Sequence, residues 1–507
     1  NHQFNRRFYI LRRYKRQASM PRSRSRRSSV EEAHEIYKKY HRHFISLDSN
    51  TNGARDDVFS AANEHDGSVP TAAPSPAKDT VEFPMYHRVM KTGVIYATSR
   101  ATIRGYCADK EEEWANMGQG APETGPIPGA PSRDFHMTIP DTELEYAPVT
   151  GLPDLREKVA KYYNHLYRTD KASQYTKDNV CIVPGGRAGI TRIMAILGTV
   201  QVGYFTPDYT AYEQALGLFI RVSPSPLLHR DQNMALMPAD DFEFEVKGRG
   251  LGAVLVSNPA NPTGQSIEGE MLNKYVDIAR RTNTSLIMDE FYSHYYYDGE
   301  GVSPEDGGAD DNSNWPKTVS SAKYIDDVNK DPVLIVNGLT KNWRCPGFRV
   351  CWIVAPKDIV SMLGSAGSYL DGGANAPLQR LSLPLMDLDF IRKDTWALQR
   401  HFKSKRDFLL RKLTELGINV QWQPTATFYI WADISALPPP LNDSLVFLEE
   451  CVRREVICVP GVFFDLNPRG LKQIDKSLCI NHVRFSYGPR MKNLELGMER
   501  IGAMISE

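Results

Sequence analysis

Short apolar runs alternate with amphipathic segments through the middle of the chain. Six runs have few polar positions and are typical of buried strands: residues 179–184, 202–207, 252–259, 285–291, 333–338 and 349–354. Helical periodicity lies between them, as in residues 270–283. Continuous apolar strands separated by helices are typical of a mostly parallel sheet with both faces covered. The pattern therefore predicts an α/β fold.

The pattern changes after about residue 365. A long helical stretch at 390–416 leads into a strand-like run at 427–434 and a second region of mixed character, which predicts a smaller C-terminal domain. Residues 298–314 are polar and rich in Gly and Asp, so we expect a surface loop there. Nearer the start, residues 46–79 have the composition of a disordered linker. A short helix before that linker, at 31–44, and a folded body from about Val81 complete the expected organisation.

Composition excludes several classes of protein. The chain has 507 residues, enough for two packed domains with tails, and 41% of them are hydrophobic. Lys plus Arg and Asp plus Glu both number 61, so overall charge does not favour nucleic acid or a membrane surface. No apolar run approaches the roughly 20 residues of a membrane span. The seven cysteines are scattered without a CxxC pair, which argues against a zinc site or a disulfide framework.

The first 30 residues contain many arginines and no acidic residue. They resemble an organellar transit peptide, which is rich in Arg and Ser and poor in acids. Two other interpretations are that Met20 is the true start and that the segment is an arm for nucleic acid. We expect a cytoplasmic protein, or a mitochondrial one if the segment is a transit peptide.

Distinctive polar residues follow the predicted strands, at the sheet edge where ligands bind in open α/β folds. The turn "GGRAGI" follows the first run, Asn261 opens "NPTG" after the third, and Asp289 follows "SLIM" in the fourth, where we expect the strand to end. Lys341 follows the fifth run and Arg349 lies eight residues later. Each has an ordinary structural explanation: a tight turn, a paired carboxylate, a surface lysine or an ion-paired arginine.

Together these residues favour one chemistry. A lysine amine can condense with an aldehyde cofactor, and an aspartate can hold a pyridine nitrogen protonated. An asparagine and a tyrosine can bind a phenolic oxygen, and a glycine turn with an arginine can hold a phosphate. All these parts fit pyridoxal 5'-phosphate.

The motifs also carry a family resemblance. "NPTG", "D-x-x-Y" at Asp289 and Tyr292, "GLTK…GFR" around Lys341 and Arg349, and "RFS" from Arg484 stand in the order of the class I/II aminotransferases, fold-type I pyridoxal-phosphate enzymes. "MGQGAPETGP", "EYAPVTGLPDLREKVA" and "TPDYTAY" resemble the family's substrate loop, dimer contact and cofactor-stacking segment. Residues 84–505 follow this pattern.

The resemblance implies an organisation. Residues 1–83 would be a basic extension and linker, and 84–130 an N-terminal segment that contributes to the small domain. Residues 131–370 would form the large cofactor-binding domain, with a mostly parallel seven-stranded sheet between helices. Residues 371–507 would form the smaller α+β domain. A homodimer with shared active sites is also implied.

The resemblance also assigns site residues. The catalytic residues would be Lys341, Asp289 and Tyr292. The other cofactor-binding residues would be Gly186, Arg187, Ala188, Tyr209, Asn261, Thr340 and Arg349, with Tyr146 reaching the neighbouring subunit. Substrate would contact Gly120, Asn261 and Arg484, and no metal is implied. One position departs from the family: Gly338 stands where a phosphate-binding serine is common, and we expect Thr340 or the "GGRAG" amides to compensate.

The implied function is a pyridoxal-phosphate-dependent aminotransferase acting between an L-amino acid and a 2-oxo acid. Other fold-type I chemistries, a carbon–sulfur lyase, a synthase or an oxidase, share these residues. An aminotransferase-like transcription regulator would need an N-terminal DNA-binding module, and no pair of helices around a turn is apparent there. No motif identifies the amino donor.

Overall fold

A computed structural model describes residues 91–227, 236–298, 302–311 and 313–507. The body described below comprises Thr92–Leu437 and Leu441–Glu507. The predicted helix at 31–44, the linker at 46–79, the start near Val81 and the Arg-rich segment lie outside the described residues. The same holds for residues 1–83 as an extension.

The larger sheet has seven strands in the order β2-β8-β7-β6-β5-β3-β4. Their bounds are β2 Val180–Val183, β3 Val200–Tyr204, β4 Val222–Pro226, β5 Ala253–Ser257, β6 Ser285–Asp289, β7 Val333–Gly338 and β8 Cys351–Val354. β8 runs antiparallel to both of its neighbours, β2 and β7, and the other strand pairs of this sheet are parallel. The expected α/β fold with a mostly parallel seven-stranded sheet is therefore confirmed.

The six predicted runs all form strands, and β4 is the strand that the pattern missed. It contains Pro224 and Pro226 among serines, and it pairs with β3 alone at the edge of the sheet. An edge position tolerates prolines, because the missing N–H groups are not needed by a second neighbour.

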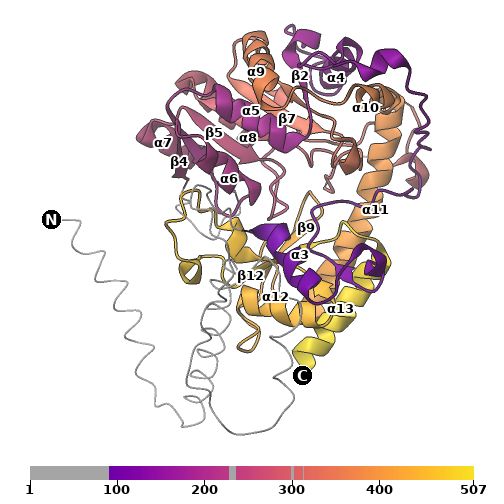
Figure 1. The fold of residues 1–507 in the computed structure, drawn as a ribbon, viewed down its shortest axis with the longest axis vertical. Helices are drawn as coiled ribbons and strands as arrows, with labels where there is room; N and C mark the ends of the chain where they lie inside the picture. Colours follow the sequence, from indigo (N-terminus) through magenta and orange to yellow (C-terminus); the bar gives the residue numbers. More distant parts are fainter. Residues whose placement is uncertain (1–90, 228–235, 299–301, 312) are drawn as a thin grey trace, which may run out of the picture. The chain divides into compact units, whose positions relative to one another are not determined.

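Helices cover both faces of this sheet (Figure 1). Side chains of successive strand residues alternate between two hydrophobic clusters: Cys181 and Val183 belong to one, and Val180 and Ile182 to the other. The first cluster includes residues of α5 Gly186–Ile196, α6 Ala211–Leu218 and α9 Lys357–Leu370. The second includes residues of α4 Pro153–Tyr167, α7 Ala239–Arg249 and α8 Gly269–Thr282. Burial on both faces explains the continuous apolar runs.

A smaller antiparallel sheet has the order β11-β12-β9, with bounds Val459–Pro460, His482–Ser486 and Tyr429–Asp433. Helices α12 Ser444–Arg453 and α13 Met491–Ser506 belong to the same region. The N-terminal part of the body joins it, because β1 Ala115–Asn116 pairs with β10 Val456–Ile457 and α3 Gly93–Ile103 packs on β11. The predicted second α+β region is present, while the boundaries at 130 and 370 stay predictions.

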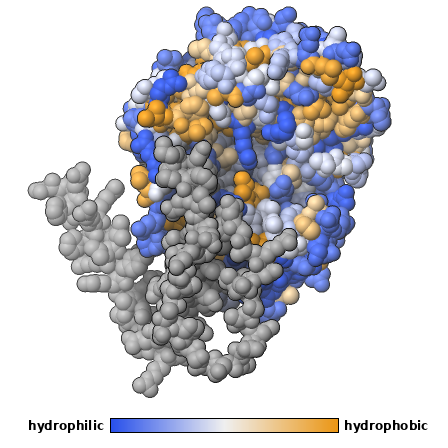
Figure 2. Space-filling model, viewed as in Figure 1, coloured by the Kyte–Doolittle hydropathy of each residue, from blue (hydrophilic) through white to orange (hydrophobic). Residues whose placement is uncertain are grey.

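The long helix α11, Leu388–Glu415, precedes β9, and the short helix α10, Ala376–Leu381, precedes α11. The polar insertion contains one short 3-10 helix, Pro304–Asp306, among its described residues, and most of these are exposed. On the face shown in Figure 2, polar residues dominate the described surface and apolar residues form separate groups. Within the described ranges, no helix combines the length and apolarity that crossing a membrane requires.

Candidate active site

The ends of three neighbouring strands bring the sequence motifs together. Ser257 at the end of β5 pairs with Asp289 at the end of β6, and Asp289 pairs with Val336 of β7. Parallel strands that end at one edge project the loops that follow them into the same space. The "NPTG" loop, the Asp289–Tyr292 segment and the Lys341 loop therefore meet there.

Asp289 is a buried carboxylate held by a tyrosine. Tyr212, in the first turn of α6, donates a hydrogen bond of 2.6 Å to Oδ2. Burial raises the pKa of Asp289 to about 6, while the bonds from Tyr212 and the Phe291 N–H and the charge of Lys341 act against that rise. The carboxylate is thus largely ionised near neutral pH although it lies 5% exposed.

Lys341 is half-buried just beyond β7, and its Nζ donates to the carbonyl of Gly120. Burial, together with the cations Arg484, Arg187 and Arg349, lowers the pKa of the amine to about 7. A large fraction of this lysine is therefore neutral near pH 7, the form that reacts with an aldehyde.

Neighbouring side chains fix the Lys341 loop. Tyr295 donates to the Lys341 carbonyl at 3.0 Å. The side chain of Asn342 accepts the His294 N–H at 3.1 Å and donates to Ser293 Oγ at 2.9 Å. The loop that carries the lysine is thereby tied to the segment that follows Asp289.

Arg484, on β12, is buried, and its charge acts on the Lys341 amine. Nη1 donates to Asn261 Oδ1 at 3.0 Å and Nη2 to the Gly118 carbonyl at 2.8 Å. Its guanidinium carbon lies 4.1 Å from the ring centre of Tyr429. Nε is buried without a hydrogen-bond partner. A planar donor with an unused N–H is suited to an additional acceptor such as a carboxylate.

Tyr429, whose ring lies against this arginine, also contacts Tyr292. Their hydroxyl oxygens lie 2.8 Å apart, and both side chains are buried. Burial raises the pKa of both hydroxyls, so each stays protonated near neutral pH. Of the two hydrogens, one can join the oxygens and the other stays available for an acceptor.

An anion cradle lies where β2 gives way to α5. Gly185 has φ 109°, and a Cβ there would come within 1.9 Å of Arg349 Nη2, so the guanidinium lies directly against the turn. Arg349 forms no ion pair with a carboxylate among the described residues and donates to the Pro346 carbonyl at 3.0 Å. Arg187 donates to Tyr209 Oη at 3.0 and 3.2 Å. Free N–H groups of the helix start and a cation suit a phosphate.

The "MGQGAPETGP" loop is anchored on both sides of Gly120. Asn116 Oδ1 accepts the N–H groups of Gly118 and Gln119. Glu123 accepts from Lys405 Nζ at 2.5 Å and also contacts His401. Burial acts to raise the pKa of Glu123, but these two contacts prevail and lower it to about 2. The loop is thus held over Lys341 by an ion pair that persists at neutral pH.

Most predicted site residues are brought together. Direct contacts or mutual electrostatic effects connect Lys341, Asp289, Tyr292, Asn261, Arg484, Arg349, Arg187, Tyr209 and Gly120. Gly186 and Ala188 lie in the first turn of α5. Thr340 Oγ1 lies 3.2 Å from Cys351 Sγ. Tyr146 is 97% exposed and is not part of this group within the single chain.

The sequence interpretation missed three side chains of the site: Tyr212, Tyr429 and Cys351. Tyr212 lies three residues after Tyr209 in "TPDYTAY", and this helical spacing is the signal that could have identified it. Tyr429 lies in an apolar strand and gave no comparable signal. Cys351 lies in a predicted strand, where a buried thiol is unremarkable.

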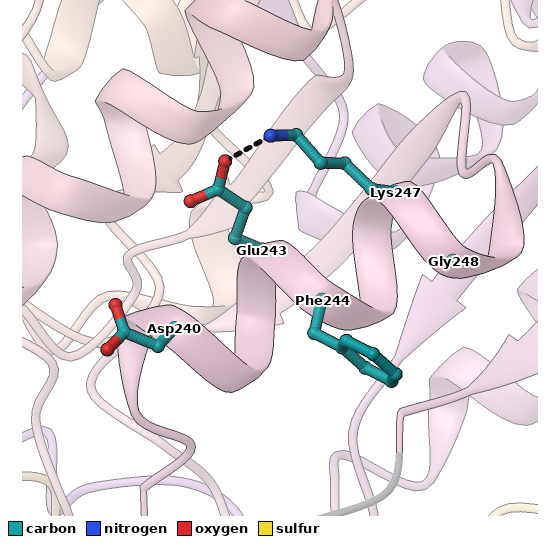
Figure 3. Close-up of a pocket in the computed structure, with 5 residues that line it drawn as sticks. All are labelled: Asp240, Glu243, Phe244, Lys247 and Gly248. Atoms are coloured by element: carbon teal, nitrogen blue, oxygen red, sulfur yellow. Dashed lines mark ion pairs between the residues drawn. The ribbon is translucent and has the colours of Figure 1, made fainter.

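A hollow elsewhere does not belong to this site. It has a volume of about 520 Å³ and is lined by Asp240, Glu243, Phe244, Lys247 and Gly248 of α7 (Figure 3). Glu243 pairs with Lys247 at 2.5 Å and with Arg281 at 2.8 Å. The charges of Glu243 and Lys247, which line the hollow, are thus already paired. Phe244 points to another side of the helix (Figure 3).

Known proteins resemble this chain in sequence. An aspartate/prephenate aminotransferase of Thermus thermophilus is 24% identical over 370 residues, which cover 72% of this chain and 84% of that protein. A probable N-succinyldiaminopimelate aminotransferase of Mycobacterium tuberculosis is 26% identical over 402 residues, covering 77% and 92%.

Solved structures share the fold. The Thermus thermophilus aspartate aminotransferase with maleate has a TM-score of 0.63 at 20% identity, covering 82% of this chain and 97% of that one. An aminotransferase from Mycobacterium tuberculosis reaches 0.66 at 20% identity, covering 84% and 100%. The model of the family "Aminotransferase class I and II" matches residues 112–501, and the chain belongs to that family.

Proposed function

We propose that this aminotransferase carries pyridoxal 5'-phosphate on Lys341 and moves an amino group between an L-amino acid and a 2-oxo acid. The observation that carries the proposal is the half-buried Lys341, whose Nζ donates to the Gly120 carbonyl and whose pKa is lowered to about 7 by burial and by the charges of three arginines, Arg484, Arg187 and Arg349. Few structural roles call for a lysine of low pKa among other cations.

The surrounding residues fit the cofactor. The Gly185 turn, the N–H groups of the α5 start and Arg349 would hold the phosphate. Asp289 would contact the ring nitrogen, and Tyr209 would lie against the ring. Asn261 and Tyr292 would bind the phenolic oxygen of the cofactor, and the Asn261 amide hydrogen-bonds Arg484 in the same site.

When bound, pyridoxal 5'-phosphate supplies an aldehyde for amines and an electron-withdrawing ring that stabilises negative charge at the substrate Cα. Lys341 Nζ is suited to take the Cα proton and return it, because its pKa lies near the working pH. The ionised Asp289 would keep a proton on the ring nitrogen. Arg484 would orient the substrate by binding its α-carboxylate, and its unpartnered Nε supports that role.

Substrate identity calls for a direct test. The relatives are named for aspartate, prephenate and N-succinyldiaminopimelate. A panel of acidic, aromatic, aliphatic and basic amino acids should therefore be added, one at a time, to the protein loaded with pyridoxal 5'-phosphate. Without oxo acid, a good donor should change the cofactor spectrum once and release one 2-oxo acid per site.

The same experiment separates the rival chemistries. Continued turnover with ammonia release would point to a lyase or an oxidase, and oxygen consumption would single out the oxidase. Borohydride should fix the cofactor on Lys341, and Lys341→Ala should lose the covalent link. A label on another lysine would contradict the proposal.

We also propose that the enzyme is a homodimer with shared sites. Tyr146 would reach the neighbouring subunit's cofactor phosphate, and its almost complete exposure in one chain supports that role. Further apolar side chains are exposed nearby in sequence and on α9: Phe135, Ile139, Leu144, Met362 and Tyr369. Side chains of this kind are enriched where subunits meet.

A further inference from the structure

The strand pair β7–β8 ends beside the anion cradle with an unusual pair of residues. Gly338 on β7 faces Cys351 on β8 in the antiparallel register. A Cβ on Gly338 would come within 2.5 Å of Cys351 Cα and 2.6 Å of its Sγ. The neighbouring strand therefore excludes a side chain at position 338, including the serine that would serve a phosphate there. Cys351 places its sulfur in that space instead.

The Cys351 sulfur is surrounded by the groups of the cradle. It lies 3.2 Å from Thr340 Oγ1, and the Gly186 N–H, Arg349 and Lys341 all act on it electrostatically. Cys345, nearer to Lys341 in sequence, differs: its Sγ lies 3.2 Å from the Trp343 carbonyl and 3.6 Å from Arg133 Nη1. Cys351 is thus the cysteine that shares its neighbours with the phosphate site.

Burial raises the pKa of the Cys351 thiol to about 11, while Thr340, Arg349, the Gly186 N–H and Lys341 act to lower it. The group therefore stays a neutral thiol near pH 7. A neutral thiol keeps its S–H and can donate to an anionic oxygen, whereas a thiolate would repel a phosphate.

The Thr340–Cys351 contact leaves one hydrogen free, whichever of the two groups is the donor. If the hydroxyl donates to the sulfur, the S–H remains available; if the thiol donates to the hydroxyl oxygen, the O–H remains available. We propose that Cys351, together with Thr340, donates this hydrogen to the phosphate of pyridoxal 5'-phosphate, in place of the serine that position 338 cannot hold. The inference rests on the function proposed above.

The test compares two probes on the full-length apo protein. Pyridoxal 5'-phosphate and pyridoxal, which lacks the phosphate, are each titrated into the wild type, Cys351→Ala and Cys351→Ser. Loss of one weak donor should weaken binding of the phosphate form about three- to tenfold in Cys351→Ala. Binding of pyridoxal should not change. Cys351→Ser should bind the phosphate form at least as tightly as the wild type, because a hydroxyl is a stronger donor than a thiol.

Cys181→Ala is the matched control. Cys181 is a fully buried cysteine of β2, next to β8 in the same sheet and in the same hydrophobic cluster. Its loss removes a buried sulfur outside the site and should alter neither titration. Melting curves of the apo variants establish whether each is folded. If Cys351→Ala does not fold, Cys351→Ser alone provides the test.

Three results would overturn the inference. Equal weakening of both probes by Cys351→Ala would assign the thiol a packing role alone. If Cys351→Ala bound both probes as tightly as the wild type does, the contact would be excluded. Weaker binding of the phosphate form by Cys351→Ser would also exclude it. If the wild type itself bound neither probe, or if borohydride left Lys341 unlabelled, the proposed function would fail first and this inference with it.

Discussion

Tyr212 donates a hydrogen bond of 2.6 Å to Asp289 Oδ2 from a helix that begins 78 residues earlier in the chain, at Ala211. Both side chains are buried, so no water competes for the carboxylate oxygen. Burial alone would favour the protonated acid, and the hydroxyl opposes it. The residue that we propose as partner of the ring nitrogen therefore depends on a side chain to which the sequence motifs assigned no role.

Replacing Tyr212 by Phe should remove the hydrogen bond that helps to keep Asp289 ionised. Loss of the bond raises the pKa of Asp289 above about 6, so less carboxylate remains at any given pH. We expect turnover to fall about ten- to hundredfold, from one charge-assisted bond of roughly 1.5–3 kcal/mol. The acidic limb of the pH–rate profile should move to higher pH. Tyr275→Phe, which removes a buried bond to the Met237 carbonyl, is the control. An unmoved acidic limb would contradict the role of Tyr212.

The Lys341 amine should react with pyridoxal 5'-phosphate at an unusually low pH. Its pKa of about 7 predicts that the rate of covalent linkage to the apo protein is half-maximal near that pH. Arg187→Leu removes one of the cations that lower the pKa, so the profile should shift toward higher pH. Stopped-flow absorbance across a pH series measures both. A half-maximal pH near that of an ordinary lysine, about 10.4, would show that the amine is not perturbed.

The motifs located this site because its chemistry lies in short local patterns. Lys341, Asp289 and Asn261 each follow or end a strand of the mostly parallel sheet, which brings strand ends together without further information. Arg484 lies within β12 of the smaller sheet, and only the "RFS" motif identified it. Tyr429 could not be found in this way, since it contacts Tyr292 from a position 137 residues away. Its strand, "TFYIWADI", is typical of any buried core strand.

The fold, too, was predictable only where local patterns determine it. Six strands that are covered on both faces of the large sheet appear in the sequence as apolar runs, and all six were predicted. Strand β4 has alternating serine and proline and depends on pairing with β3, which is a tertiary contact. The exclusion of a side chain at Gly338 is also tertiary, because it depends on the register with β8.

Glu290 should make the stability of the apo protein depend on pH. It is fully buried, and Oε1 accepts from the Ser321 N–H at 2.8 Å and from Ser321 Oγ at 2.7 Å. Oε2 has no partner. Burial raises the pKa to about 7, against bonds from Ser320 and Ser321, and Asp289 adds to the rise. Because the folded state prefers the protonated acid, its stability is full below about pH 4.5 and declines as the pH rises through about 7.

Glu290→Gln removes this titration and keeps an oxygen acceptor for Ser321. We expect a gain in the free energy of unfolding of up to about 3 kcal/mol at about pH 8, and little change at about pH 4. Urea unfolding of the apo protein at both pH values measures the difference. Glu495→Gln, at an exposed position of α13, controls for the loss of one carboxylate. A gain that is equal at both pH values would exclude titration as its cause.

Tyr146 tests the proposed dimer. Tyr146→Phe removes a hydroxyl that would donate to the partner's cofactor phosphate, a contact of roughly 1.5–3 kcal/mol. The protein should stay dimeric by sedimentation but lose cofactor faster on dialysis. Tyr369→Phe, on a tyrosine that is 70% exposed on α9, serves as control and should retain cofactor normally. A fully active monomer would rule out shared sites.

Arg484→Lys separates charge from geometry. The guanidinium now divides its donors between Asn261 and the Gly118 carbonyl, and Nε remains for a further acceptor. Lysine keeps the positive charge but has one nitrogen, so it cannot serve Asn261, the loop carbonyl and a two-pronged carboxylate in the same plane. Apparent substrate affinity should fall about ten- to hundredfold, the equivalent of roughly 1.5–3 kcal/mol. Covalent attachment of the cofactor at Lys341 should persist.

The control for this change is another buried arginine. Arg168 is fully buried and donates to the carbonyls of Ser173, Ala322 and Ile325. Arg168→Lys should therefore lower the melting temperature and leave substrate affinity unchanged. Titrating each variant with a good amino donor, followed by the cofactor spectrum, gives the two affinities. If Arg484→Lys bound the donor as tightly as the wild type does, the α-carboxylate would have to lie elsewhere, and the Nε of Arg484 would need another explanation.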